Sequence, residues 1–134
     1  MLTDNDIVQI SRRIVERCAP LVVGTFGSYG VGSPRPRSDL DVFVISKNGG
    51  DLAARVLAVK RLLFGVLHPV DVFVFTPQEF EESAYEEQSF TWVIVEQARL
   101  YHWHEEAPLL VPSLAFKAIQ SGWTKVTARN SPAQ

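Results

Sequence analysis

Two strongly apolar segments of this chain each contain an aspartate, and this feature restricts the possible folds more than any other. Residues 40–45 read Leu-Asp-Val-Phe-Val-Ile and residues 70–75 read Val-Asp-Val-Phe-Val-Phe. Such runs are typical of strands that helices cover on both faces. Because a buried carboxylate without a partner costs several kcal/mol, the fold must bring Asp41 and Asp71 to water or to a cation.

A third aspartate, Asp39, stands two residues before Asp41. Strand side chains alternate between faces, so these two carboxylates point the same way, and their repulsion raises a pKa unless a cation lies between them. If the two apolar strands pair, Asp71 joins them, and three carboxylates suit one or two Mg²⁺ ions. The alternative is that the acids lie at strand ends, solvated or paired with arginine. The Asp-x-Asp spacing and the second strand favour the metal site.

The remaining sequence predicts helices around these strands. With 134 residues, 46% of them hydrophobic and 21% charged, the chain has the length and composition of one globular domain. We predict the fold class α/β (α+β), a single domain with a central mixed β-sheet flanked by helices. The expected elements are a helix between Thr3 and Pro20, a strand over 21–26, a loop over 27–38, a strand over 40–45, a helix over 51–64, a strand over 70–75, a helix from Thr76, a helix from Ser89 to Gln97, a strand over 99–103 and a short helix over 113–121.

A glycine–serine pair, Gly27-Ser28, follows the first expected strand. Glycine allows the backbone N–H groups to approach a ligand, and the Ser28 hydroxyl adds a donor. The following Tyr29 either stacks on a base or packs into the core. The stretch does not match the phosphate-binding P-loop pattern.

The order of these motifs resembles a known family. Gly27-Ser28, then after ten residues Asp39-Leu40-Asp41-Val42, and later Asp71, is similar to the signature of the nucleotidyltransferase superfamily that includes DNA polymerase β. The match is most like its minimal nucleotidyltransferase branch and covers roughly residues 5–103. The resemblance implies a nucleotidyltransferase domain over 1–103 and a C-terminal extension over 104–134, with a short helix and a loose tail.

The resemblance also implies an activity and a metal site. Members move a nucleoside monophosphate from a nucleoside triphosphate to an acceptor hydroxyl, so we expect AMP transfer from ATP or from another triphosphate. Asp39 and Asp41 are expected to bind two Mg²⁺ ions, for which Mn²⁺ is a possible substitute. Asp71 is expected to complete the site on the side of the attacking hydroxyl and to accept its proton.

The phosphates are expected to bind to the glycine-rich loop. By resemblance, Gly27 and Ser28 hold the β- and γ-phosphates. Many members carry an arginine where this chain has Val31, and Arg35 and Arg37 in the same loop would supply positive charge instead.

Residues 76–106 carry eight acidic residues and one arginine, a net charge of −7. The simpler interpretation is a solvated helix face, and the alternative is a docking surface for a basic partner. Minimal nucleotidyltransferases are typically encoded beside a HEPN-domain protein and act as its antitoxin by transferring AMP to it. The resemblance therefore implies such a partner.

Two other functions remain open from the sequence. One is nucleotidylation of a small molecule such as an aminoglycoside by a homo-oligomer, a dimer with a shared cleft. The other is a non-catalytic partner-binding module that keeps the fold, although the intact Asp39, Asp41, Asp71 and Gly27-Ser28 argue against it.

Composition narrows the cellular setting. No apolar run is long enough for a membrane span and the N-terminus has no signal-peptide pattern, so no membrane association is expected. The single cysteine, Cys18, fits a reducing compartment, and we expect a cytoplasmic protein. The net charge of −2 does not favour direct nucleic-acid binding.

Overall fold

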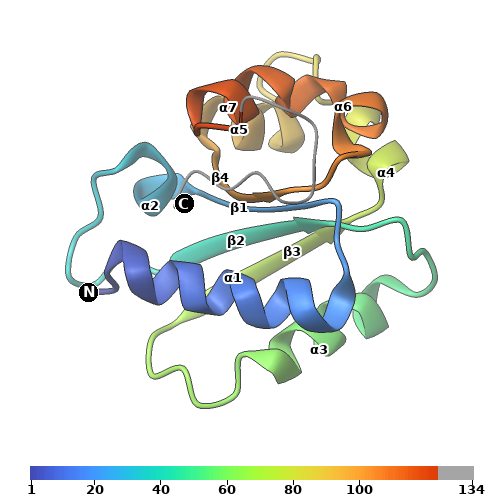
Figure 1. Cartoon of the computed structure of the whole chain (residues 1–134). Coiled ribbons are helices and arrows are strands. Elements are labelled where there is room, and N and C mark those ends of the chain that lie inside the picture. The colour runs from blue at the N-terminus through green and yellow to red at the C-terminus, as the bar shows by residue number, and fades with distance from the viewer. Residues whose placement is uncertain (124–134) are drawn as a thin grey trace.

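Four strands form one mixed sheet, and helices cover both of its faces (Figure 1). The computed structural model describes residues 1–123. The strands are β1 (Val22–Phe26), β2 (Leu40–Ile45), β3 (Val70–Phe75) and β4 (Arg99–Trp103). The helices are α1 (Asp4–Cys18), α2 (Gly27–Val31), α3 (Leu52–Leu62), α4 (Pro77–Glu82), α5 (Phe90–Gln97), α6 (Ala107–Leu110) and α7 (Ala115–Gln120), with a 3₁₀ turn η1 (Pro112–Leu114). The predicted fold class is confirmed, while α2 and α6 lie where no helix was expected.

The strand order is β3-β2-β1-β4. Strand β1 is antiparallel to both of its neighbours, whereas β2 and β3 run parallel and are joined through α3. A parallel pair requires such a crossover, because the chain must return to the starting end of the sheet. Strands β2 and β3 therefore begin at the end of the sheet where β1 finishes, beside α2 in Figure 1.

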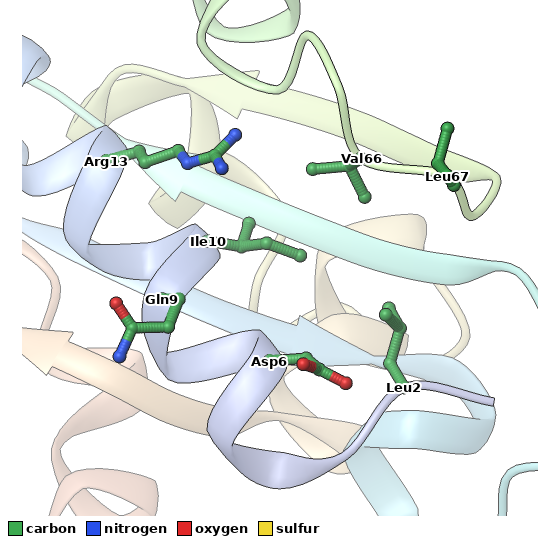
Figure 2. Close-up of a pocket in the computed structure, with 7 residues that line it drawn as sticks. All are labelled: Leu2, Asp6, Gln9, Ile10, Arg13, Val66 and Leu67. Carbon is green, nitrogen blue, oxygen red and sulfur yellow. The ribbon is translucent and has the colours of Figure 1, made fainter.

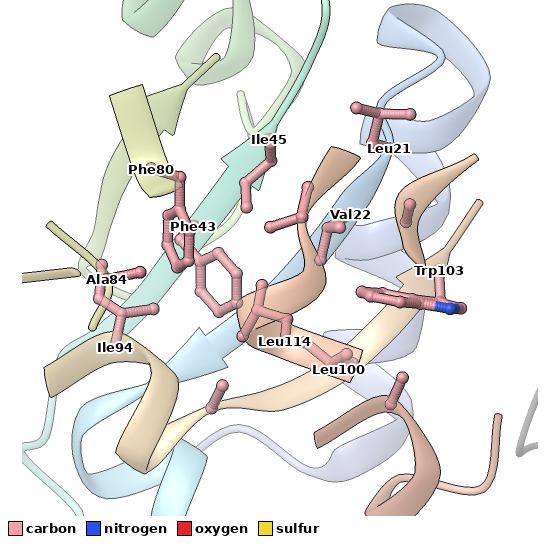
Figure 3. Packing of buried hydrophobic residues seen from close by; sticks show 14 of the residues in the cluster. Leu21, Val22, Phe43, Ile45, Phe80, Ala84, Ile94, Leu100, Trp103 and Leu114 are labelled. Carbon is pink, nitrogen blue, oxygen red and sulfur yellow. The ribbon is translucent and has the colours of Figure 1, made fainter. Parts of the chain in front are cut away.

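The two faces of the sheet bury two separate apolar clusters. On one face, α1 and α3 pack on alternate strand residues such as Val42, Val44 and Val72. On the other face, Phe43 and Ile45 pack under α4, α5 and the segment from α6 to α7, with Phe80, Trp103 and Leu114 fully buried among them (Figure 3). This second cluster lies on the same face of β2 as Asp41, because strand side chains alternate.

The opposite end of the sheet, where β2 and β3 finish, is held together by polar contacts. Thr76 and Glu79 form a capping box at the start of α4. Arg55 of α3 donates from Nη1 and Nη2 to the two Glu79 carboxylate oxygens at 2.9 and 3.1 Å. These bonds from Arg55, with the Thr76 backbone N–H, lower the pKa of Glu79 to about 2. The pair ties a helix of one layer to a helix of the other.

The predicted domain boundary at residue 103 is not where the core ends. Ala107, Val111, Leu114, Ala118 and Trp123 are all buried in the second cluster. Glu81 of α4 also accepts hydrogen bonds from the Ser113 backbone N–H and hydroxyl. Residues 104–123 are therefore part of the same packed unit, because they cover the sheet face that α4 and α5 leave open.

The tail predicted from residue 124 lies outside the described residues. Within residues 1–123, no helix has both the length and the apolarity needed to cross a lipid bilayer.

Removing the side chain of Leu114 tests whether the segment after β4 belongs to the core. Leu114 is fully buried, so we expect Leu114→Ala to lower the free energy of unfolding by about 2–5 kcal/mol, measured by urea denaturation. The matched control is Leu109→Ala, because Leu109 is 87% exposed and its loss should change stability by less than about 0.5 kcal/mol. Equal, small effects of both substitutions would mean that residues 104–123 are an appendage.

Candidate active site

Gly27-Ser28 at the start of α2, which we call the glycine–serine turn, and the three predicted aspartates meet at one end of the sheet. Phe26, the last residue of β1, is the register partner of Asp41, and Asp41 is in turn the partner of Asp71. Gly27 follows Phe26 directly, and Asp39 immediately precedes β2. The antiparallel β1–β2 pair and the parallel β2–β3 pair therefore bring together residues from three distant parts of the sequence.

Gly27 and Asp41 are packed against each other. Gly27 has a φ of +66°, in the left-handed region, and a Cβ atom at this position would lie 2.4 Å from Asp41 Oδ2. A side chain would thus be strained by its backbone and would collide with the carboxylate. Glycine is required here because it leaves the space that the Asp41 carboxylate occupies.

The Asp41 carboxylate is the electrostatic centre of the site. Burial raises its pKa most, and the nearby charges of Asp71 and Asp39 raise it further. The three acids do not share this burial, since Asp41 is half-buried while Asp39 and Asp71 are exposed. Asp71 is exposed because β3 is an edge strand of the sheet, which agrees with the expectation that the fold brings this carboxylate to water or to a cation.

An aromatic cluster adjoins the carboxylates on the same sheet face. The ring centroids of Phe26 and Phe73 lie 5.4 Å apart, and that of Phe90, at the start of α5, lies 5.2 Å from Phe73 and 5.8 Å from Phe26. Phe26 is opposite Asp41, and Phe73 is two residues along β3 from Asp71. These rings take water away from the inner side of Asp41, which explains why burial contributes most to its raised pKa.

The donor set at this end of the sheet fits a divalent cation. The Asp41–Asp71 pair and the nearby Asp39 offer carboxylate oxygens, which Mg²⁺ and Mn²⁺ prefer, and their mutual repulsion is the condition that a cation relieves. Within residues 1–123, no three His, Cys, Asp or Glu side chains are grouped closely enough to form a preassembled metal site. The charge of Asp39 is close enough to raise the pKa of Asp41, but the three carboxylates do not form a compact cluster.

The expected phosphate-binding residues are only partly available. The Gly27 N–H already donates to Gln97 Oε1 at 3.0 Å, whereas the hydroxyl of the half-buried Ser28 makes no hydrogen bond to any other described residue. Arg35 and Arg37 are exposed, and neither guanidinium has an ion-pair partner within residues 1–123. Nothing in the local sequence around Gln97 indicates its contact with a residue 70 positions earlier, so sequence analysis missed it.

Two neighbouring rings support the loop that carries the arginines. Tyr29 is 95% buried, and its hydroxyl oxygen accepts a hydrogen bond from the Leu2 N–H, so it packs into the core and is not a base-stacking residue. His68 Nε2 donates to the Ser38 carbonyl oxygen at 2.8 Å, and its ring lies edge-on to Tyr29. His68 thereby holds the backbone just before Asp39.

A pocket of about 250 Å³ lies away from the carboxylates, between α1 and the segment after α3 (Figure 2). Two of its three polar side chains are already committed to helix ends, and the third, Gln9, is exposed. Asp6 belongs to the capping box of α1, and Arg13 donates to the carbonyl oxygens of Leu62 and Phe64. The pocket therefore has no evident part in chemistry at the acidic end of the sheet.

Comparison with known proteins agrees with this geometry. The family model described as "Nucleotidyltransferase domain" matches residues 7–120. A crystal structure of a toxin–antitoxin with AMP-PNP contains a chain that is 19% identical, with 90% of this chain and 91% of that chain covered and a TM-score of 0.53. A mutant form of the toxin–antitoxin MntA–HpeT gives 18% identity, the same coverage and a TM-score of 0.53. At these identities the two structures show a shared fold. A search of curated proteins finds no match.

Substitution of Asp41 by Asn tests the electrostatics of the site. A carboxyl pKa that is raised in the folded state means that ionisation favours unfolding, so stability is lost as pH rises through the folded pKa. We therefore expect Asp41→Asn to raise the midpoint of thermal unfolding at pH 7 in metal-free buffer by about 2–4 °C.

The gain should disappear below the ordinary aspartate pKa of 3.8, where the wild-type side chain is also neutral. Glu105→Gln, which removes an exposed charge elsewhere, serves as the control. If the Asp41→Asn protein unfolds at a lower temperature than the wild type at pH 7, the conclusion that the ionised Asp41 destabilises the fold is contradicted.

Proposed function

The chain belongs to the nucleotidyltransferase domain family, and we propose that it transfers AMP from ATP to a hydroxyl group of a protein partner. The observation that carries this proposal is the junction of Gly27, Asp41 and Asp71 at one end of the sheet. Nucleotidyl transfer requires a place where triphosphate oxygens, cations and an acceptor hydroxyl meet. This end of the sheet supplies donors and carboxylates together and leaves two of the carboxylates exposed to solvent.

Asp39, Asp41 and Asp71 are the residues that would hold two Mg²⁺ ions, or Mn²⁺ in their place. When bound, such ions supply positive charge that activates the attacking hydroxyl and stabilises the leaving pyrophosphate. The half-buried Asp41 suits the central position, since desolvation strengthens its interaction with a cation.

The remaining residues divide the work of binding and proton transfer. The acceptor oxygen forms a bond to the α-phosphorus while the bond from that phosphorus to the pyrophosphate oxygen breaks. Asp71 is exposed and within reach of an incoming hydroxyl, and we assign it as the acceptor of the hydroxyl proton. Ser28 donates to the β- and γ-phosphates beside Gly27, and Arg35 and Arg37 add positive charge from the loop before Asp39.

The partner is proposed to be a HEPN-type toxin, with this chain as its antitoxin. Support comes from the shared fold with chains of toxin–antitoxin structures, one of which contains AMP-PNP. Three of the eight acids in residues 76–106 already have partners within the chain, because Glu79, Glu81 and Glu106 bind Arg55, Ser113 and Lys47. Of the five that remain, we select for docking the three that lie close together in the sequence. Glu82 at the end of α4, with Glu86 and Glu87 in the segment before α5, are exposed and form what we call the acidic docking face.

The enzymatic part of the proposal is tested by mixing the chain with ATP, Mg²⁺ and the protein encoded beside it. We expect the intact mass of that protein to increase in steps of one AMP. Asp39→Asn/Asp41→Asn should slow the transfer by about 10²–10³-fold, since it removes the ligands for the charge-stabilising ions.

The double variant is expected to remain folded, because its substitutions relieve repulsion, and a thermal melt provides that control. Transfer at the wild-type rate by the folded double variant, or transfer that persists in excess EDTA, would contradict the proposed function.

The docking part is tested by reversing the acidic docking face. Glu82→Lys/Glu86→Lys/Glu87→Lys should slow modification of the partner by about tenfold at low salt, and the difference should shrink as ionic strength rises. Glu81 is left unchanged, because its bonds to Ser113 hold the packing of α4. The control reverses three exposed acids outside the face: Glu16, Glu96 and Glu105. If both triple variants behave alike, net charge and not this face governs docking.

A further inference from the structure

The contact between Gly27 and Gln97 links the glycine–serine turn to the end of α5. The Gly27 N–H donates to Gln97 Oε1 at 3.0 Å, and Gln97 is the last residue of α5. On its other side Gly27 packs against Asp41 Oδ2, at the position where a Cβ would lie 2.4 Å away. Gly27 is therefore held from two directions, by a side-chain amide and by a carboxylate of the metal site.

Helix α5 is itself fixed firmly against the turn. A Cβ atom on Gly30 of α2 would lie 2.4 Å from the Gln97 carbonyl oxygen and 2.9 Å from the Thr25 carbonyl oxygen. The absence of a side chain at Gly30 thus allows the end of α5 to rest directly on α2. At the other end of α5, Phe90 packs on Phe26 and Phe73. A helix anchored at both ends is a rigid base from which Gln97 can position its hydrogen-bond partner.

We propose that Gln97 is a positioning residue for the triphosphate, acting through Gly27 to orient Ser28. This inference rests on the proposed function, in which Ser28 contacts the β- and γ-phosphates. The Gly27 N–H is satisfied by the protein, so the phosphate contact passes to Ser28, whose hydroxyl has no other partner among the described residues. Because the two residues are consecutive, fixing the Gly27 amide limits the directions in which Ser28 can point.

The competing explanation makes the opposite prediction. If Gln97 Oε1 only fills the position of a phosphate oxygen, ATP must displace it, and removing it would tighten ATP binding. If Gln97 orients the turn, removing Gln97 weakens ATP binding. Ser28 then loses its fixed direction, and part of the binding free energy is spent on ordering Ser28. The sign of the change therefore separates the two.

The experiment measures ATP binding in the presence of Mg²⁺ by calorimetry for the full chain and its variants. Gln97→Met keeps the length and packing of the side chain but removes the acceptor, and we expect ATP affinity to fall about fivefold to tenfold. In a double-mutant cycle with Ser28→Ala, the second substitution should cost little once the first is present, because both act on one contact. Glu96→Ala, which truncates the exposed neighbouring side chain, should leave affinity unchanged.

The outcomes distinguish this inference from the proposed function. Absence of ATP binding by the wild-type chain would overturn the proposed function and the role of Gln97 with it. Wild-type binding with unchanged or tighter binding by Gln97→Met would overturn the role of Gln97 alone, as would additive losses in the cycle.

A measurement on the wild type decides the matter if Gln97→Met does not fold. In amide NMR spectra, ATP should shift the Ser28 resonance strongly, while the Gly27 amide stays protected from hydrogen exchange. A Gly27 amide that loses protection when ATP binds would overturn the inference.

Discussion

The packing of the Asp41 carboxylate against Gly27, next to Asp71 on the neighbouring strand, is the constraint on which the rest of the structure depends. Two carboxylates on adjacent strands repel each other, and the aromatic rings behind Asp41 strengthen this repulsion by excluding water. The arrangement persists because β2 is buried along the rest of its length and β3 buries Val72 and Val74 beside it. Val42, Val44 and Val72 pack on one face, and Phe43 and Ile45 on the other.

The strand topology places the repulsion between these carboxylates at one end of the sheet. Parallel pairing of β2 and β3 through α3 places both aspartates at the same end, and antiparallel pairing of β1 brings Gly27 to them. The other end is closed by the bidentate pair of Arg55 and Glu79 between α3 and α4. At one end of the sheet, opposite charges are paired and stabilise the fold. At the other end, carboxylates of like charge have no cationic side chain as a partner among the described residues and are available for chemistry.

The layer from α4 to α7 has two roles that are physically connected. Its buried residues, among them Phe80, Leu114 and Trp123, complete the core, and its helix α5 carries Gln97 and Phe90 to the site. Helix α5 contacts β1 and α2, and Lys117 of α7 donates to its Glu96 carbonyl oxygen, so the site is supported by a packed element. The same packing explains why residues 104–123 cannot be separated from the catalytic domain, although the family resemblance ended near residue 103.

The sequence by itself determined the features that have a short period or a local cap. The apolar runs over 40–45 and 70–75 put Asp41 among buried neighbours, and Thr3 and Thr76 marked helix starts that the structure confirms. Tertiary structure alone decided strand order, the unequal burial of Asp41 and Asp71, the packing of Tyr29 and the bond from Gly27 to Gln97. The physical reason is that local patterns depend on bond geometry within a few residues. The edge position of β3 and a contact across 70 residues depend instead on how distant elements share one core, which no single segment specifies.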